Sequence, residues 1–171
     1  MKKIILLFLF AMCLHAHAQV NNHSYGMPSE TSYNHITWNA KVDFKQQVLV
    51  AEAIYQLKVT AQSKQLILDS KNLKIDQVWV DDQPAVWQLG KSDGLLGAPL
   101  TIAVTPKSKT VKVSYVTTDK SDALLWVEGK KPFLFTQSQA ILARTWIPCQ
   151  DQPSLRFTYE ANVEVPSDLL A

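Results

Sequence analysis

From residue 38 onward, hydrophobic and polar positions alternate along the chain with a period of two residues. The first run places Trp38, Ala40, Val42 and Phe44 on one face, with polar residues between them. Such alternation is typical of β-strands that bury one face and leave the other in contact with water. Comparable runs or short apolar segments occur at 51–59, 73–75, 78–80, 86–89, 100–104, 111–115, 133–135 and 157–165.

Turn-forming residues separate these runs. They stand at 81–84, 91–94, 105–108 and 128–130, where Asp, Ser, Gly and Pro favour a reversal of the chain. No segment keeps a helical period of 3.6 residues, and no repeat of fixed length appears. We therefore predict a single all-β domain built on a large antiparallel sheet, with one face covered and the other partly in contact with water.

Two adjacent carboxylates, Asp81 and Asp82, could suggest an acid/base site. They stand where a hairpin must reverse its direction. We therefore interpret them as turn residues.

The first 18 residues have the pattern of a signal peptide. Lys2 and Lys3 precede an unbroken apolar run, and Ala16-His-Ala18 supplies the small residues that signal peptidase recognises. The run is too short to span a bilayer, which takes roughly 20 residues. A buried N-terminal helix and a lipoprotein signal at Cys13 are the alternatives. Cleavage after Ala18 predicts an exported protein, periplasmic or secreted, in which residues 19–34 form a polar arm before a β-rich domain at 35–171.

Loss of the signal peptide changes the charge balance. The whole chain has 17 basic and 15 acidic residues, and residues 1–18 hold two of the basic ones and none of the acidic ones. The remaining part is therefore formally neutral, and its basic residues are scattered. This balance argues against nucleic acid as a partner, and against an anionic membrane surface once the signal is removed.

Cys149 is the one cysteine that remains after Cys13 leaves with the signal, so no intramolecular disulfide is expected. A nucleophilic cysteine would need a histidine base, and only His23 and His35 remain, both far upstream. We therefore expect Cys149 to be a packed, structural residue.

The most unusual segment is 136–153, which combines closely spaced glutamines, an arginine, the cysteine and two prolines. Taken alone, its first glutamines could be an ordinary edge strand. The segment resembles the leukotriene A4 hydrolase/aminopeptidase N family (peptidase family M1), as do 66–75 and 121–126. The resemblance implies a curved, saddle-like β-domain that leans over a thermolysin-like zinc domain. It also implies a strand pair at 66–75, and a loop at 121–126 before the substrate segment.

By this resemblance, Gln139 and Ala140 would face the active-site cleft, with Gln137 and Ser138 beside them. Gln139 would bind the N-terminal end or backbone of a peptide substrate, since an amide offers a donor and an acceptor without charge. Relatives often have a glutamate there, so glutamine implies a weaker contact to the substrate's amine. The remaining residues are expected to form a rigid structural turn that orients the glutamines: Arg144, Pro148, Cys149, Asp151 and Pro153.

Zinc in this family requires His-Glu-x-x-His on a helix, which neither His23 nor His35 begins. We therefore expect zinc only in the full-length enzyme, none bound by this chain, and no activity of the chain alone. The sequence ends soon after the strand at 157–165, which we interpret as a domain truncated before its catalytic partner. The alternatives are a free-standing exported β-domain that binds peptide or protein, and a structural module of a larger assembly. The downstream sequence would distinguish them.

Overall fold

The computed structural model describes residues 23–171, so the expected signal peptide lies outside the described residues. Within the described part the chain forms eleven strands and one short 3-10 helix. In chain order these are β1 (Thr31–Asp43), β2 (Val48–Val59), β3 (Gln65–Ser70), β4 (Lys74–Val80), β5 (Gln83–Pro84), β6 (Trp87–Leu89), β7 (Ala98–Ala103), β8 (Thr110–Val116), β9 (Leu124–Val127), β10 (Phe133–Thr136), η1 (Ala143–Thr145) and β11 (Thr158–Glu164).

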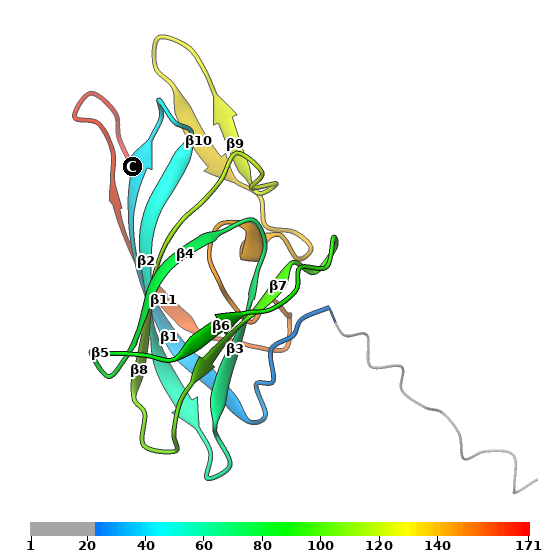
Figure 1. Ribbon diagram of the computed structural model, residues 1–171. Helices are drawn as coiled ribbons and strands as arrows, with labels where there is room; N and C mark the ends of the chain where they lie inside the picture. Colours follow the sequence, from blue (N-terminus) through cyan, green and yellow to red (C-terminus); the bar gives the residue numbers. More distant parts are fainter. Residues whose placement is uncertain (1–22) are drawn as a thin grey trace, which may run out of the picture.

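The strands form three sheets, which confirms the predicted all-β class. A six-stranded sheet has the order β11-β1-β2-β8-β4-β5, a three-stranded sheet has the order β3-β7-β6, and β9 pairs with β10 alone. The large sheet is twisted and curved, and the three-stranded sheet faces part of it (Figure 1). β11 lies at the edge of the large sheet and pairs with β1 only, so the sheet is open on that side.

One pairing in the large sheet is parallel. β1 and β11 run in the same direction, from His35 opposite Thr158 to Lys41 opposite Glu164. Parallel neighbours need a long crossover connection, and here the chain between β10 and β11 crosses the layer between the sheets. That connection carries residues 137–153, which include all the predicted substrate-contacting and turn residues.

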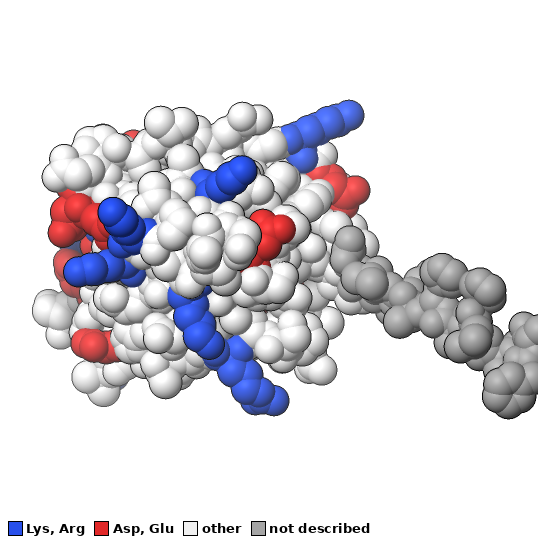
Figure 2. All heavy atoms as spheres, turned by 90° about the horizontal axis from the view of Figure 1, so that it is seen from below, with Lys and Arg blue, Asp and Glu red and all other residues white. Residues whose placement is uncertain are grey.

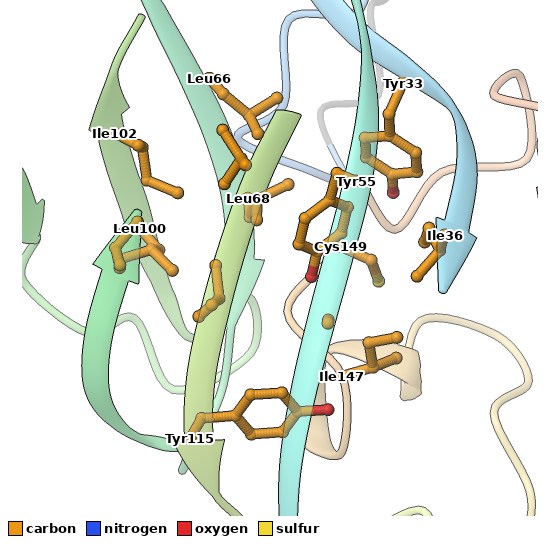
Figure 3. Close-up of a cluster of buried hydrophobic side chains, with 14 of the residues drawn as sticks. Tyr33, Ile36, Tyr55, Leu66, Leu68, Leu100, Ile102, Tyr115, Ile147 and Cys149 are labelled. Carbon is orange, nitrogen blue, oxygen red and sulfur yellow. The ribbon is translucent and has the colours of Figure 1, made fainter. Parts of the chain in front are cut away.

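The hydrophobic core lies between the two larger sheets. Ala51, Ala53 and Tyr55 of β2 are buried at alternate positions, as the two-residue period predicts. On the opposing sheet, Leu66 and Leu68 pair with Ile102 and Leu100. Figure 3 shows Tyr55 of the large sheet beside Leu68 of the opposing sheet, with Leu66, Leu100 and Ile102 close by. Full burial of each large aliphatic side chain contributes roughly 1.5–3 kcal/mol.

β1 begins at Thr31, inside the segment expected to be a polar arm. Thr31 and Ser32 are buried and pair with Val59 and Lys58 of β2, while Tyr33 fills the core at 1% exposure. Strand pairing and burial therefore extend β1 into a segment whose polar composition had predicted no strand.

The expectation of a loop at 121–126 was wrong for its second half. Leu124 to Val127 form β9, which pairs with β10 in a hairpin. Leu124 is buried and Trp126 packs beside it, whereas Leu125 and Val127 face outward. Because both faces of this strand are apolar, it lacks the alternation that identifies a half-buried strand.

Asp81 and Asp82 form the predicted turn. They connect β4 to β5 with φ angles of 49° and 61°, and two successive positive φ values are typical of a type I′ hairpin. The Asp81 carboxylate accepts hydrogen bonds from the backbone amides of Lys109 and Thr110, both at 2.9 Å. The Asp81 carboxylate therefore has a structural role, and Asp82 supplies the second positive φ of the turn.

Candidate functional site

Residues 137–140 lie in a loop that begins where β10 ends, at Thr136. Its first residue is fixed, because the Gln137 amide donates to the Ala123 carbonyl at 2.9 Å. The Gln137 side chain folds back onto the loop, where its Oε1 accepts from the Gln139 amide at 3.0 Å. The two glutamines are thus part of a compact loop, and the alternative of an ordinary edge strand does not describe them.

Ser138 points toward the protein and Gln139 away from it. The Ser138 hydroxyl accepts from Trp146 Nε1 at 2.9 Å, and its carbonyl accepts from the Leu142 amide at 2.9 Å. Gln139 and Ala140 are exposed and joined by a cis peptide bond. No hydrogen bond joins the Gln139 side chain to another described residue, so its amide can offer both a donor and an acceptor to a molecule in solution.

Three buried tyrosines hold the segment that follows the loop. The Tyr115 hydroxyl donates to the Trp146 carbonyl at 2.9 Å and accepts from Trp38 Nε1 at 2.8 Å. The Tyr55 hydroxyl donates to the Pro148 carbonyl. The Tyr33 hydroxyl accepts from the Gln150 amide at 3.0 Å.

These three tyrosines come from β1, β2 and β8, and their rings reach up from the large sheet toward residues 147–149 (Figure 3). Their hydroxyls satisfy polar backbone groups at every second residue, which a buried loop could not otherwise achieve. Burial raises the pKa of all three phenols, so they remain neutral hydrogen-bonding groups. Sequence reasoning missed this role, since alternation marks Tyr55 and Tyr115 only as core residues and Tyr33 lies in the segment expected to be a polar arm.

Arg144 is fully buried in η1, and its guanidinium makes four hydrogen bonds. It donates to the Asp151 carboxylate at 3.1 Å, and to the carbonyls of Leu96 at 3.0 Å, His23 at 2.6 Å and Asp151 at 3.1 Å. It also lies 3.6 Å from the carboxylate of Asp69, which is fully buried as well.

Asp69 was not anticipated from the sequence. Its carboxylate accepts from the Ser24 hydroxyl at 2.5 Å and from the amides of Tyr25 and Asp151 at 2.7 and 2.9 Å. A buried charge is stable only when it is paired and hydrogen-bonded. Asp69 and Arg144 satisfy this requirement together, and they attach residues 23–25 of the expected arm to the domain.

The predicted turn residues lie close together in the structure, but they differ in burial. Pro148 and Cys149 are buried, Asp151 is half-buried and Pro153 is exposed. Cys149 is a free thiol whose pKa is raised by burial and by the nearby carboxylates of Asp151 and Asp69. Burial also raises the pKa of Asp151, against the opposing effect of Arg144.

Within residues 23–171, no group of three or more His, Cys, Asp and Glu side chains is arranged to hold a metal ion. His35 instead shares a hydrogen bond of 2.8 Å with the Thr158 hydroxyl, across the β1–β11 pair. This part of the chain therefore does not fit a zinc centre.

Charged side chains are dispersed over the surface. On the face shown in Figure 2, Lys and Arg occur singly or in small groups near Asp and Glu. No helix among the described residues is both long and apolar enough to cross a bilayer.

Comparison with known proteins identifies the domain. The Peptidase M1 N-terminal domain family matches residues 29–171. The chain is 35% identical over 161 residues to leukotriene A-4 hydrolase of Xenopus laevis, covering 86% of this chain and 26% of that protein. It is 37% identical over 150 residues to leucine aminopeptidase 2 of Coccidioides immitis, covering 80% and 24%.

The fold agrees with a solved structure. Yeast LTA4 hydrolase in complex with bestatin superposes with a TM-score of 0.80 at 28% identity, over 94% of this chain and 27% of that chain. The chain thus spans about a quarter of the length of the relatives it matches. From the match over residues 29–171 and these relatives, the chain belongs to the Peptidase M1 N-terminal domain family.

Proposed function

We propose that the chain is the substrate-contacting N-terminal domain of an exported zinc metallo-aminopeptidase, an enzyme that removes N-terminal residues from peptides. The observation that carries the proposal is the loop at 137–140, which is held in place by the domain and presents one uncommitted amide, that of Gln139. Family membership supports the class of enzyme.

In this function the Gln139 side chain binds the substrate, while Gln137 and Ser138 hold the loop in position. The Gln137 side-chain oxygen already accepts a hydrogen bond from the Gln139 amide, and the Ser138 hydroxyl accepts one from Trp146 Nε1. The Gln139 side chain can therefore accept a hydrogen bond from the substrate's terminal amine or donate one to its backbone carbonyl. The exposed Ala140 leaves room for a peptide to approach.

Zinc is proposed for a thermolysin-like catalytic domain in the full-length enzyme. Residues 23–171 lack a suitable ligand group, so no catalytic step is assigned to them. Such an ion, when bound, would polarise the scissile carbonyl and activate a water molecule. This chain would contribute the wall of the cleft that orients the peptide.

The substitution Gln139→Ala in the full-length enzyme tests the role of the loop. We expect a higher KM for peptides, with zinc content unchanged, because the variant loses a substrate contact and no metal ligand. The matched control is Gln88→Ala, which truncates an exposed glutamine on β6. Unchanged peptide kinetics in the Gln139 variant would contradict the proposed contact.

The isolated chain provides a second test. We expect it to hydrolyse no aminoacyl-arylamide, with or without added zinc. Chelator-sensitive turnover by the purified chain would contradict the proposal that this chain contacts the substrate and a separate domain carries the zinc. A reading frame that stops after Ala171 would instead favour a free-standing β-domain that binds peptide or protein.

Export is tested separately. Processing by signal peptidase should leave Gln19 as the first residue of the mature protein. N-terminal sequencing of protein from the periplasm or medium would detect it, whereas an intact Met1 would contradict export by this route.

A further inference from the structure

Residues 23–26, here called the N-terminal strap, contact the segment that supports the loop at 137–140, the glutamine loop. The His23 carbonyl accepts from the Arg144 guanidinium at 2.6 Å. The Ser24 hydroxyl and the Tyr25 amide donate to the Asp69 carboxylate at 2.5 and 2.7 Å. The strap lies in the segment expected to be a polar arm, yet three successive residues fix it to the domain.

Both partners of the strap are buried charges. The side chains of Arg144 and Asp69 are fully buried. The strap supplies two of the three hydrogen bonds that described residues donate to the Asp69 carboxylate, and the Asp151 amide supplies the third. A buried charge is costly wherever such bonds are missing. The contacts of the strap are therefore part of the support of the candidate site.

Gly26 completes the strap by packing closely on Gln150. A Cβ atom at position 26 would lie 2.7 Å from Gln150 Cγ and 3.0 Å from Gln150 Cβ, whereas a favourable carbon–carbon contact is roughly 3.5–4.0 Å. Gln150 has little room to move aside, because it is 2% exposed and its Nε2 donates to the Thr31 carbonyl at 2.9 Å. Any larger residue at position 26 would therefore displace Gln150 or the strap.

The helix η1 connects the strap to the glutamine loop. Arg144 is its middle residue, and Leu142 and Trp146 flank it on either side. Both flanking residues hold Ser138: the Leu142 amide donates to its carbonyl and Trp146 Nε1 to its hydroxyl, each at 2.9 Å. A displacement of η1 therefore moves both supports of Ser138, the residue that precedes Gln139.

The helix η1 has two separate attachments to the domain. Its backbone is held by the sheets, because the Lys71 amide donates to the Arg144 carbonyl and the Tyr115 hydroxyl to the Trp146 carbonyl, both at 2.9 Å. Its central side chain is held by the strap, through the bond between Arg144 and His23. The strap therefore adds a restraint on η1 that the sheets do not provide.

We propose that the N-terminal strap positions the substrate-contacting loop, and that Gly26 is the residue that permits its close packing. The inference rests on the proposed function, in which the Gln139 side chain binds the peptide. The strap restrains η1 through Arg144, and η1 holds Ser138 in place. The residues of the strap need not touch the substrate, because they act through Gln139.

The matched pair Gly26→Ala and Gly94→Ala tests this positioning in the present chain. Both replace glycine by alanine, but a Cβ atom at position 94 would have no neighbour within 4 Å. Hydrogen exchange followed by NMR reports on the Leu142 amide and the Trp146 indole N–H, which both donate to Ser138. We expect Gly26→Ala to speed exchange at both groups severalfold, and Gly94→Ala to leave it unchanged.

The Val113 amide distinguishes local loosening from a general loss of stability. Val113 lies in β8, which is paired with strands on both sides, so its exchange reports on unfolding of the sheet. We expect its exchange rate to change less in Gly26→Ala than the rates at Leu142 and Trp146. An equal acceleration at all three groups would overturn the positioning role.

Ser24→Ala is the second variant, in case Gly26→Ala does not fold. It removes one hydrogen bond to Asp69 and adds no bulk. We expect a smaller acceleration at the Leu142 amide and the Trp146 indole. Unchanged exchange at both groups in every folded strap variant would overturn the inference.

A double-mutant cycle in the full-length enzyme tests whether the strap acts through Gln139. Gly26→Ala should raise the KM for peptides severalfold in the wild-type background. The same substitution should have little further effect in the Gln139→Ala background, because effects that act through one shared contact are not additive. An equal increase of KM in both backgrounds would overturn the inference.

The kinetic and exchange measurements separate this inference from the proposed function. If Gln139→Ala alone leaves peptide kinetics unchanged, the proposed substrate contact is contradicted, whereas faster exchange at Leu142 and Trp146 in Gly26→Ala still supports the link from strap to loop. If Gln139→Ala raises KM but Gly26→Ala does not, only the positioning role is contradicted.

Discussion

Asp69 and Cys149 exchange both of their backbone hydrogen bonds, although they are distant in the sequence. The Asp69 amide donates to the Cys149 carbonyl at 2.7 Å, and the Cys149 amide donates to the Asp69 carbonyl at 3.1 Å. The Asp69 carboxylate also accepts from the amides of Tyr25 and Asp151. One residue of β3 therefore joins the N-terminal segment to the segment that supports the glutamine loop.

Replacement of the buried cation should be strongly destabilising. Arg144→Met keeps an unbranched, flexible side chain but leaves the Asp69 and Asp151 carboxylates without their cationic partner. Removal of one member of a buried ion pair costs about 3–5 kcal/mol, so the free energy of unfolding in urea should fall by this amount. Lys41→Met is the control, because Lys41 pairs with Glu164 at the surface and exposed pairs contribute little. Equal shifts of the two urea midpoints would contradict the assigned role.

The tyrosine supports predict a second stability effect. Tyr115→Phe removes the hydroxyl that joins Trp38 Nε1 to the Trp146 carbonyl, and leaves both groups without this partner. Each unsatisfied buried group costs about 1–3 kcal/mol, and thermal or urea unfolding should show a loss of at least this size. Tyr159→Phe is the control, since Tyr159 is 75% exposed. A neutral effect at Tyr115 would show that water replaces the hydroxyl.

Asp151 should make stability depend on pH in an unusual direction. Burial raises the pKa of its carboxyl in the folded state, so the folded protein binds a proton more readily than the unfolded chain does. This contribution is fully present below the unfolded pKa of about 3.9, and is lost as pH rises to the folded pKa.

Asp151→Asn removes this titration. We expect the free energy of unfolding of the wild type, minus that of Asp151→Asn, to fall as pH increases from about 4 toward neutrality. Urea unfolding at a series of pH values measures the difference. A difference that rises with pH would show that Arg144 lowers the carboxyl pKa more than burial raises it.

The β4–β5 turn predicts opposite effects at adjacent residues. Asp82→Gly should stabilise the domain by up to about 1 kcal/mol, because glycine adopts positive φ without strain. Asp81→Gly should instead destabilise it by about 1 kcal/mol, because three hydrogen bonds to the Asp81 carboxylate are lost. Thermal unfolding of both variants measures the two stability changes. Changes of equal sign and size would contradict the different roles assigned to Asp81 and Asp82.

Cys149 should be unreactive in the folded protein. Its thiol is buried and its pKa is raised, so little thiolate forms and reagents cannot reach it. Iodoacetamide at neutral pH should modify Cys149 only after denaturant is added, and peptide mass spectrometry would distinguish Cys149 from Cys13. Rapid modification of the folded protein would contradict the structural role.

The strands could be predicted where a pattern of neighbouring residues, the two-residue alternation, identifies them. Val111, Val113 and Tyr115 of β8 are all fully buried, because each successive side chain points to the opposite face of a strand. β9 was missed for the same physical reason, since a strand with two apolar faces does not alternate. The turn at Asp81 and Asp82 was predicted correctly, because the preference for a turn also depends on residues that are adjacent in the sequence.

The support of the candidate site was only partly predictable. The hydrogen bond from Arg144 to Asp151 joins residues only seven positions apart, and the resemblance had assigned both residues to one structural turn without pairing them. The contacts of Arg144 with His23 and of Tyr33 with Gln150 join opposite ends of the chain. No pattern in a single sequence encodes such a contact, because each residue's local environment is compatible with many partners.

The parallel pairing of β1 with β11 has a consequence for assembly. Among the described strands, β1 is the first to be synthesised, yet one of its two neighbours, β11, is the last. During synthesis β1 can pair with β2 at once, but its other edge stays open until the ribosome has made nearly all of these residues. Loops of this length close slowly, so a nascent chain must protect that edge from foreign strands until the final one arrives.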